Sequence, residues 1–273
     1  MDTQTQQAPI GIFDSGVGGL SVLRAIRVQL PNENLLYFAD QGHVPYGPRS
    51  LEEVRQFSEA ITNYLLEHGA KLIVVACNTA SAAALHYLRQ TFPSIPFVGM
   101  EPAVKPAAEQ TNSGVVGVLA TPATFQGELY ASVVERFASG VTVLQNTCSG
   151  LVEEIERGAV AEENAKAILE SALRPMLERG LDTVVLGCTH YPFVIPQIEA
   201  ICGDSVRVID PAPAVARQVE RRLDTLRLLN PQTDGQVQII TSGESAKLNS
   251  LIPQLCKETH PVRRVSWLDR KPV

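Results

Sequence analysis

The sequence has 273 residues, more than the usual size of one domain, so we expect two medium domains rather than one large one. Hydrophobic residues make up 45% of it and its formal net charge is -6, which excludes the basic surface of a nucleic-acid-binding protein. No apolar run approaches the ~20 residues that span a bilayer, and residues 1–9 are polar. We therefore expect a cytoplasmic protein with neither a membrane nor a nucleic-acid partner.

The cysteines are odd in number, scattered and never spaced as Cys-x-x-Cys; they are Cys77, Cys148, Cys188, Cys202 and Cys256. This pattern predicts neither a disulfide framework nor a zinc site. No cluster of His, Asp and Glu has the spacing of metal ligands either. We expect free thiols and no bound metal.

The first predicted strand, residues 10–13, ends at the glycine-rich turn Asp14-Ser15-Gly16-Val17-Gly18-Gly19, and apolar residues then recur at helical spacing. The turn lacks the third glycine of a dinucleotide fingerprint, and Asp14 would repel a nucleotide phosphate. Its backbone N–H groups, at a helix start, instead offer a site for a carboxylate. Asp14 either takes part in the chemistry or only caps the helix.

A second predicted strand, residues 34–39, leads into residues 40–49, where two prolines and two glycines predict a shaped loop. A capping box of Ser50 and Glu53 predicts the next helix, which ends near residue 68. The third predicted strand begins at residue 72, and Cys77 lies at its end.

The residues after this cysteine, Asn78 and Thr79, begin another predicted helix. Their side chains either cap the helix or hold a substrate carboxylate at its N-terminus, and the two roles are compatible. Four prolines between residues 93 and 106 then predict a crossing between lobes.

The second half of the chain repeats this plan. A predicted strand over residues 115–120 ends at Thr121-Pro122-Ala123-Thr124, before a helix predicted from Phe125 to about Ala138. A strand over 141–145 precedes the segment from Cys148 to Gly158, and an amphipathic helix is predicted over 161–179. We interpret the acids of this region mostly as a solvated helix face.

An apolar run then stops at Gly187, and Cys188, Thr189 and His190 follow it directly. Most free cysteines are buried core residues. Cys77 and Cys188, however, both follow the end of a predicted strand, and polar residues come directly after each of them. In open parallel sheets, ligands bind outside the carboxyl ends of the strands. The pair therefore predicts one site assembled from two similar halves.

The last part of the chain predicts a helix from about residue 212, a strand over 237–241, a helix over 245–255 and a strand over 262–267. The charges of residues 217–227 are typical of a solvated helix face.

Alternation of strands and helices predicts an α/β fold of two pseudo-symmetric lobes, each a mostly parallel sheet covered by helices, with the active site in the cleft between them. We assign residues 1–101 and 212–273 to lobe 1, and residues 102–211 to lobe 2.

Five motifs together resemble the glutamate racemases of the aspartate/glutamate racemase family, over nearly the whole chain. They are Asp14-Ser15-Gly16-Val17-Gly18-Gly19-Leu20, Pro45-Tyr46-Gly47, Cys77-Asn78-Thr79-Ala80, Thr121-Pro122-Ala123-Thr124 and Gly187-Cys188-Thr189-His190-Tyr191-Pro192. The resemblance implies a cofactor-independent isomerase, a homodimer, that supplies D-glutamate for bacterial peptidoglycan. Aspartate racemases and other two-cysteine racemases share the two-thiol plan, so aspartate stays open as a substrate.

The resemblance also implies residue roles. Cys77 and Cys188 are the acid/base pair, facing the D and the L enantiomer respectively, and Asp14 and His190 assist them. Glu156 is the helper carboxylate by its spacing to Gly158; because Ser149-Gly150 and Glu153-Glu154 stand where apolar residues and proline are common, Glu153 stays open as an alternative. The residues implied to hold the amino acid are Asp14, Ser15, Tyr46, Gly47, Asn78, Thr79, Thr121, Thr124 and Thr189.

The chemistry explains the pairing independently. Inversion of a stereocentre by proton transfer needs a base on one face of the Cα and an acid on the other, and thiols with a pKa of about 8.5 serve as both. No lysine lies in these motifs, so we expect no pyridoxal cofactor. Two alternatives are a small-anion binding protein with inert thiols, and a thiol hydrolase using one cysteine and His190, which leaves the other cysteine unexplained.

Overall fold

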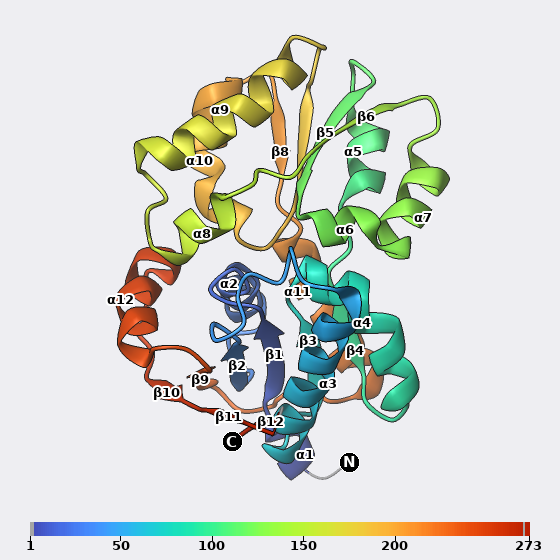
Figure 1. Ribbon diagram of the computed structural model, residues 1–273. Helices are drawn as coiled ribbons and strands as arrows, with labels where there is room; N and C mark the ends of the chain where they lie inside the picture. The colour runs from blue at the N-terminus through green and yellow to red at the C-terminus, as the bar shows by residue number, and fades with distance from the viewer. Residues whose placement is uncertain (1–2, 270) are drawn as a thin grey trace.

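The computed structural model describes residues 3–269 and 271–273, and it contains two parallel sheets that lie one above the other in Figure 1. The lower sheet has six strands in the order β10-β9-β2-β1-β3-β4, and the upper sheet has four in the order β6-β5-β7-β8. All neighbouring strands in both sheets are parallel. The predicted fold class, two parallel sheets covered by helices, is confirmed.

The strands of the larger sheet are β1 (Ile10–Asp14), β2 (Leu35–Ala39), β3 (Leu72–Val75), β4 (Phe97–Gly99), β9 (Val237–Thr241) and β10 (Val262–Arg264). Those of the smaller sheet are β5 (Val115–Ala120), β6 (Thr142–Asn146), β7 (Thr183–Gly187) and β8 (Arg207–Ile209). A short antiparallel pair, β11 (Trp267–Leu268) and β12 (Lys271–Pro272), follows β10.

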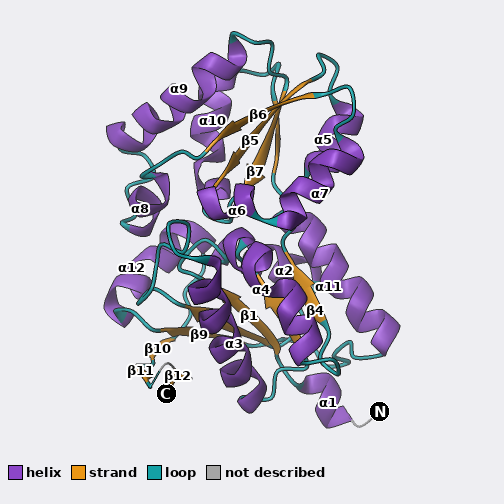
Figure 2. Cartoon of the chain, turned by 45° about the vertical axis from the view of Figure 1, so that its right-hand side comes forward, coloured by secondary structure: helices purple, strands orange, loops and turns teal. Residues whose placement is uncertain are grey.

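Helices cover both faces of each sheet, as Figure 2 shows. Those of the larger sheet are α1 (Thr3–Gln7), α2 (Leu20–Gln29), α3 (Leu51–Glu67), α4 (Asn78–Thr91), α11 (Ala212–Leu226) and α12 (Ser245–Cys256). Those of the smaller sheet are α5 (Val104–Gln110), α6 (Pro122–Gln126), α7 (Glu128–Phe137), α8 (Leu151–Glu156), α9 (Glu163–Leu177), the 3-10 helix η1 (Tyr191–Val194) and α10 (Ile195–Cys202).

The two sheets share one strand plan. The order β2-β1-β3-β4 in the larger sheet matches β6-β5-β7-β8 in the smaller one, so β3, which precedes Cys77, corresponds to β7, which precedes Cys188. We keep the division into lobes near residues 102 and 211 as a proposal. It is supported by the sheets themselves, because one draws its strands from residues 10–99 and 237–264 and the other from residues 115–209.

Local sequence explains why these elements form. Strands β1 and β3 are buried along their whole length, which fits the continuous apolar runs of a parallel sheet covered on both faces. The predicted capping box is present, since Ser50 and Glu53 exchange side-chain to backbone hydrogen bonds at the start of α3.

Three expectations about local structure were wrong. The helix predicted from Phe125 to Ala138 is two helices, because Gly127 is extended between them and lies so close to α4 that a Cβ would meet Ala82 Cβ at 2.7 Å. The last strand, predicted over 262–267, is broken after β10, because Ser266 pairs with Val273 instead.

The third error concerns the acids that follow β6. Glu154, which we interpreted as part of a solvated face, is buried with 6% of its surface exposed, and Glu156, the candidate helper carboxylate, is buried with 5% exposed. They lie on α8, a helix that the sequence did not predict. Both carboxylates have hydrogen-bond partners inside the protein, which is why burial is tolerated.

One half-buried carboxylate fixes the loop that leads into β5. Asp182 accepts hydrogen bonds from Thr111 Oγ1 at 2.6 Å, from the backbone N–H groups of Asn112 at 2.6 Å and Ser113 at 2.8 Å, and from Thr183 Oγ1 at 2.9 Å. Burial alone would raise the pKa of Asp182, but these hydrogen bonds outweigh it and lower the pKa to about 2.

We expect Asp182→Asn to reduce the free energy of unfolding at pH 7 by about 1–3 kcal/mol, because an amide cannot accept all these bonds. The folded pKa lies below the unfolded value, so this contribution is full above pH ~4 and is lost as the pH falls towards 2. Urea unfolding at pH 7 and at low pH measures it, with Asp204→Asn, at an exposed position, as the control. Equal midpoints for Asp182→Asn and the unchanged protein at pH 7 would contradict it.

Candidate active site

The two strand-end cysteines line one cavity between the sheets. Its volume is about 220 Å³, below the ~300–1,000 Å³ of pockets for drug-sized ligands, so it fits a small metabolite. Cys77 and Asn78 reach it from the larger sheet, and Cys188 and Thr121 from the smaller one. The prediction of one site built from two similar halves describes this arrangement, because the carboxyl ends of β3 and β7 face each other across the cavity.

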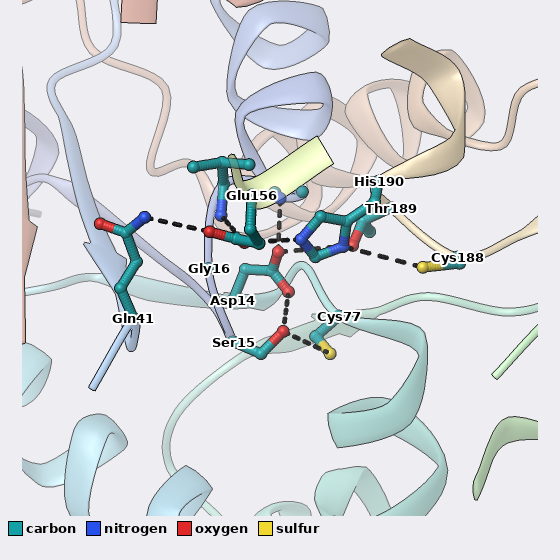
Figure 3. A network of polar contacts seen from close by, with 12 residues as sticks. Asp14, Ser15, Gly16, Gln41, Cys77, Glu156, Cys188, Thr189 and His190 are labelled. Atoms are coloured by element: carbon teal, nitrogen blue, oxygen red, sulfur yellow. Dashed lines mark hydrogen bonds and ion pairs between the residues drawn. The ribbon is translucent and has the colours of Figure 1, made fainter. Parts of the chain in front are cut away.

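Cys77 occupies the N-cap of α4, where its Sγ accepts a hydrogen bond from the N–H of Ala80 at 3.4 Å. The same sulfur lies 3.9 Å from Ser15 Oγ, and that hydroxyl lies 3.3 Å from Asp14 Oδ1, so Asp14 reaches the thiol through Ser15 (Figure 3). The other oxygen of Asp14 accepts from the N–H of Gly19, at the start of α2. Asp14 therefore fills both roles left open by the sequence: it anchors the helix start and approaches a thiol.

Electrostatics at this thiol favour its protonated form. Burial raises the pKa of Cys77 well above its usual value, and the neighbouring carboxylate of Asp14 raises it further. Burial also raises the pKa of Asp14. At neutral pH, Cys77 is therefore a thiol ready to donate a proton.

This leads to a prediction about Cys77 reactivity. Only the thiolate is alkylated, so we expect the rate of Cys77 alkylation by iodoacetamide to rise about tenfold per pH unit from pH 7 to beyond pH 9. Removing the negative charge in Asp14→Asn should speed alkylation at pH 8, because the repulsion of the thiolate is lost. Peptide-resolved mass spectrometry measures both, and a plateau in rate below pH 8 would be inconsistent with the raised pKa.

Cys188 has a different pair of neighbours. Nδ1 of His190 lies 3.7 Å from Cys188 Sγ, and Nε2 of the same ring lies 2.7 Å from Glu156 Oε1 (Figure 3). The imidazole thus stands between the thiol and the carboxylate. Of the two candidate helper acids, Glu156 makes this contact, whereas Glu153 is exposed and lines the cavity.

His190 and Glu156 form a charged pair. Burial lowers the pKa of His190, but its contacts with Cys188 and Glu156 outweigh burial and raise the pKa well above the usual value. Burial raises the pKa of Glu156, but the hydrogen bonds from His190, Gln41 and Val17 outweigh it and lower the pKa. A protonated imidazole can donate a hydrogen bond to the sulfur of Cys188, which stabilises the thiolate form.

The glycine-rich turn is shaped around this pair. A Cβ at Gly16 would overlap the carboxylate of Glu156, and a Cβ at Gly18 would lie 2.5 Å from Nδ1 of His190. The absence of side chains lets the N–H of Val17 donate to Glu156 Oε1 at 2.7 Å. The carboxylate site that the sequence predicted at this turn is thus filled by the protein's own Glu156 and Asp14.

The residues expected to hold the substrate fall into two groups. Seven of them line the cavity: Ser15, Tyr46, Gly47, Asn78, Thr79, Thr121 and Thr189. The structure does not bring Asp14 and Thr124 to the cavity wall, because Asp14 is behind Ser15 and Thr124 is behind Thr121, with 3.0 Å between the threonine hydroxyls.

The most informative of these residues is Asn78. Its side chain is 3% exposed and neither amide atom has a hydrogen-bond partner among the described residues. A buried unpaired amide is costly, so a ligand in the cavity is the natural partner. Beside it, Thr79 Oγ1 and Thr121 Oγ1 lie 2.8 Å apart and join the two halves.

Several residues of the site were missed. One wall is formed by the segment after β6, where the missed residues are Thr147, Cys148, Ser149, Gly150 and Val152. Cys148 and Gly150 both have positive φ, 45° and 89°, so the segment makes a tight turn towards the cavity. The neighbouring Cys148 and Gly150 were the available signals, but nothing in the sequence separated this turn from an ordinary loop.

Asp40 was also missed, although it shapes the loop that carries Tyr46. It is fully buried and accepts hydrogen bonds from the Tyr46 hydroxyl at 2.6 Å, Ser242 Oγ at 2.6 Å and Trp267 Nε1 at 2.9 Å. Two of these donors come from the end of the chain, so sequence spacing could not reveal the network.

Comparison with known proteins identifies the family. The model of the Asp/Glu/Hydantoin racemase family matches residues 10–219. The chain belongs to this family. A glutamate racemase from Roseiflexus sp. is 53% identical over 249 residues, which cover 90% of this chain and 92% of that protein.

Solved racemase structures agree with this assignment. The structure of a glutamate racemase isoform from Bacillus anthracis matches with a TM-score of 0.86 and 30% identity, covering 97% of this chain and 99% of that one. A glutamate racemase from Francisella tularensis, solved in complex with D-glutamate, matches with a TM-score of 0.84 and 29% identity over 96% and 98% of the two chains. The resemblance drawn from the motifs, and the expectation of an isomerase of the racemase class, are confirmed.

Two further observations concern residues 3–269 and 271–273. No helix there has the length and apolar character to cross a membrane. Within the same residues, His, Cys, Asp and Glu side chains form no group of three or more that could hold a metal ion.

Proposed function

We propose that this racemase interconverts L-glutamate and D-glutamate by moving a proton at the Cα between two thiols. The observation that carries the proposal is that Cys77 and Cys188 line the same small cavity from corresponding strands of the two sheets. Opposed thiols are what inversion of a carbon centre requires, since one face must lose a proton and the other must gain one. A binding protein or a one-cysteine hydrolase would leave this opposition without a purpose.

The proton transfers follow from the neighbours of each thiol. With L-glutamate bound, the Cys188 thiolate takes the Cα proton while the Cys77 thiol delivers one to the opposite face, which gives D-glutamate. Glu156 keeps His190 protonated, and His190 stabilises the thiolate before the transfer. Asp14, through Ser15, exchanges the proton of Cys77. The reverse reaction uses the same groups with their protonation exchanged.

The cavity also offers groups that suit glutamate. Its two carboxylates have partners in the unpaired amide of Asn78, the hydroxyls of Thr79, Thr121 and Thr189, and the N-terminus of α4. Glutamate as substrate is further supported by the names of relatives that share about half of their residues with this chain. Aspartate, one methylene shorter, is the competing substrate to test.

The biological setting is part of the proposal. By resemblance to glutamate racemases, the enzyme acts in the cytoplasm as a homodimer and supplies D-glutamate for peptidoglycan synthesis. Loss of cell-wall integrity on depletion, relieved by added D-glutamate, is the expected phenotype.

One assay tests the substrate. Purified protein with L- or D-glutamate, and with L- or D-aspartate, is followed by circular dichroism in buffer without added cofactor or metal. Loss of the glutamate signal from either enantiomer, with little change for aspartate, is the expected result. Faster racemisation of aspartate than of glutamate would show that aspartate is the preferred substrate. No change in signal with any of the four amino acids would reject the proposed activity.

A separate prediction concerns cofactors. We expect activity to survive exhaustive dialysis against a chelator and treatment with hydroxylamine, because the thiols need neither a metal nor pyridoxal phosphate to move a proton. Activity is measured before and after each treatment. A loss of activity that is restored by adding back a metal or pyridoxal phosphate would show that the two thiols alone do not carry out the reaction.

A further inference from the structure

A chain of hydrogen bonds runs behind the cavity from Thr241 to Cys188 and crosses from one lobe to the other. Thr241 Oγ1 donates to Gln41 Oε1 at 3.1 Å, and Gln41 Nε2 donates to Glu156 Oε2 at 3.0 Å. The other oxygen of Glu156 meets His190, which contacts Cys188. Figure 3 shows Gln41 on the side of Glu156 away from His190.

The loop after β9 holds Gln41 in one orientation. Gly243 packs so closely that a Cβ there would lie 2.7 Å from Gln41 Cβ, and the N–H of Gly243 donates to Thr241 Oγ1 at 3.0 Å. The next residue, Gly42, donates its N–H to Ser242 Oγ at 2.9 Å. Gln41 is half-buried and is not part of the cavity wall, so it cannot act on a substrate directly.

The geometry points to Gln41, oriented by Thr241, as a positioning residue for the Cys188 half of the reaction: its amide holds the Glu156 carboxylate in place to keep His190 protonated beside the thiol. The link to racemisation rests on the proposed function. The relay itself, the contacts from Thr241 through Gln41, Glu156 and His190 to Cys188, is a property of the protein without substrate. The contacts of Cys77 run instead through Ser15 to Asp14, whose other oxygen accepts from Thr189 Oγ1 at 3.4 Å, and they do not pass through Gln41.

The energetic reason is the burial of Glu156. A buried carboxylate is stable only when both oxygens have donors. Val17 and His190 serve Oε1, and Gln41 is the donor recorded for Oε2. Without the amide of Gln41, the pKa of Glu156 rises, since one of the hydrogen bonds that lower it is gone. His190 then holds its proton less firmly, and the thiolate of Cys188 loses its partner.

The first experiment measures each thiol without using catalysis. Gln41→Met, which keeps the length and removes the amide, and Gln41→Glu, which adds a second carboxylate, are alkylated with iodoacetamide at pH 8 and analysed by peptide mass spectrometry. The rate at Cys188 should fall about tenfold, about 1.4 kcal/mol, while the rate at Cys77 changes by less than about twofold.

A matched pair at the other end of the relay gives a second test. Thr241→Val removes the hydroxyl at nearly constant volume and should reduce Cys188 alkylation in the same direction, whereas Thr241→Ser keeps the hydroxyl and should retain the rate. Unchanged Cys188 alkylation in both Gln41→Met and Gln41→Glu, or equal loss at both thiols, would overturn the inference.

The second experiment links the relay to turnover. Since the enantiomers have equal free energy, kcat/KM must fall equally in both directions, and the asymmetry appears in isotope effects instead. In Gln41→Met, the deuterium isotope effect on kcat/KM should increase with C2-deuterated L-glutamate and decrease with C2-deuterated D-glutamate, because steps at Cys188 become more rate-limiting. Isotope effects that change equally would reject the positioning role. A Cys188-specific alkylation change in a protein without racemase activity would uphold the relay and reject the proposed function.

Discussion

Replacement of either Cys77 or Cys188 by serine is expected to lower racemisation by several powers of ten, each about 1.4 kcal/mol of barrier. A serine hydroxyl is a far weaker acid than a thiol and has no appreciable alkoxide form near pH 7, so it can neither take nor give the Cα proton at a useful rate. Racemisation is measured by circular dichroism with both enantiomers. A near-normal rate of racemisation in either variant would contradict the two-thiol mechanism.

The remaining thiol should still exchange the proton that it faces. By the assignment of faces, Cys188→Ser should incorporate deuterium from solvent into D-glutamate, and Cys77→Ser into L-glutamate, in each case without inversion. Proton NMR in deuterium oxide follows this exchange. Deuterium incorporation into the opposite enantiomers would still support the two-thiol mechanism, but it would reverse the assignment of each thiol to a face of the substrate. Cys202→Ser, on α10 and outside the cavity wall, is the matched control and should leave both readouts unchanged.

A single methyl group at Gly16 is expected to lower kcat/KM by about a hundredfold in both directions. The added Cβ would overlap the carboxylate of Glu156, which must then leave the N–H of Val17 and its contact with His190. Misplacement of a catalytic group by about 1 Å costs this much, although the chain keeps every reacting side chain.

The control for Gly16→Ala separates site damage from general destabilisation. Gly180 has a φ of 84° and open space around its Cα, so Gly180→Ala strains the backbone by about 1 kcal/mol without touching the cavity. It should lower the melting temperature and leave kcat/KM unchanged. If Gly16→Ala kept kcat/KM within a few fold of the original, the Glu156 contacts would have no part in catalysis.

The sequence by itself determined the fold class and the positions of the two thiols. Apolar runs that stop at a small residue before Cys77 and Cys188 predict buried strands, and alternation with helices makes those strands parallel. Strand ends in such sheets carry ligand sites, so the sequence alone predicts that both cysteines belong to the site. These features are local in the chain, which is why local patterns predict them.

The tertiary structure decided what surrounds each thiol. Glu156, rather than Glu153, contacts His190 because α8 turns one acid inward and leaves the other exposed. The glycines at 16 and 18 proved to be sites of close approach to Glu156 and His190, which sequence spacing does not encode. Contacts between segments far apart in the chain depend on how the two sheets and their helices pack together.

The same reason explains the remaining differences. Gln41 and Thr241 are 200 positions apart, yet they touch because β2 and β9 are neighbours in one sheet. Gly127 ends a helix early because α4, a helix of the larger sheet, packs against it. The sequence predicts which elements form and which residues lie at their ends, whereas packing between the two sheets and their helices decides which of those residues meet.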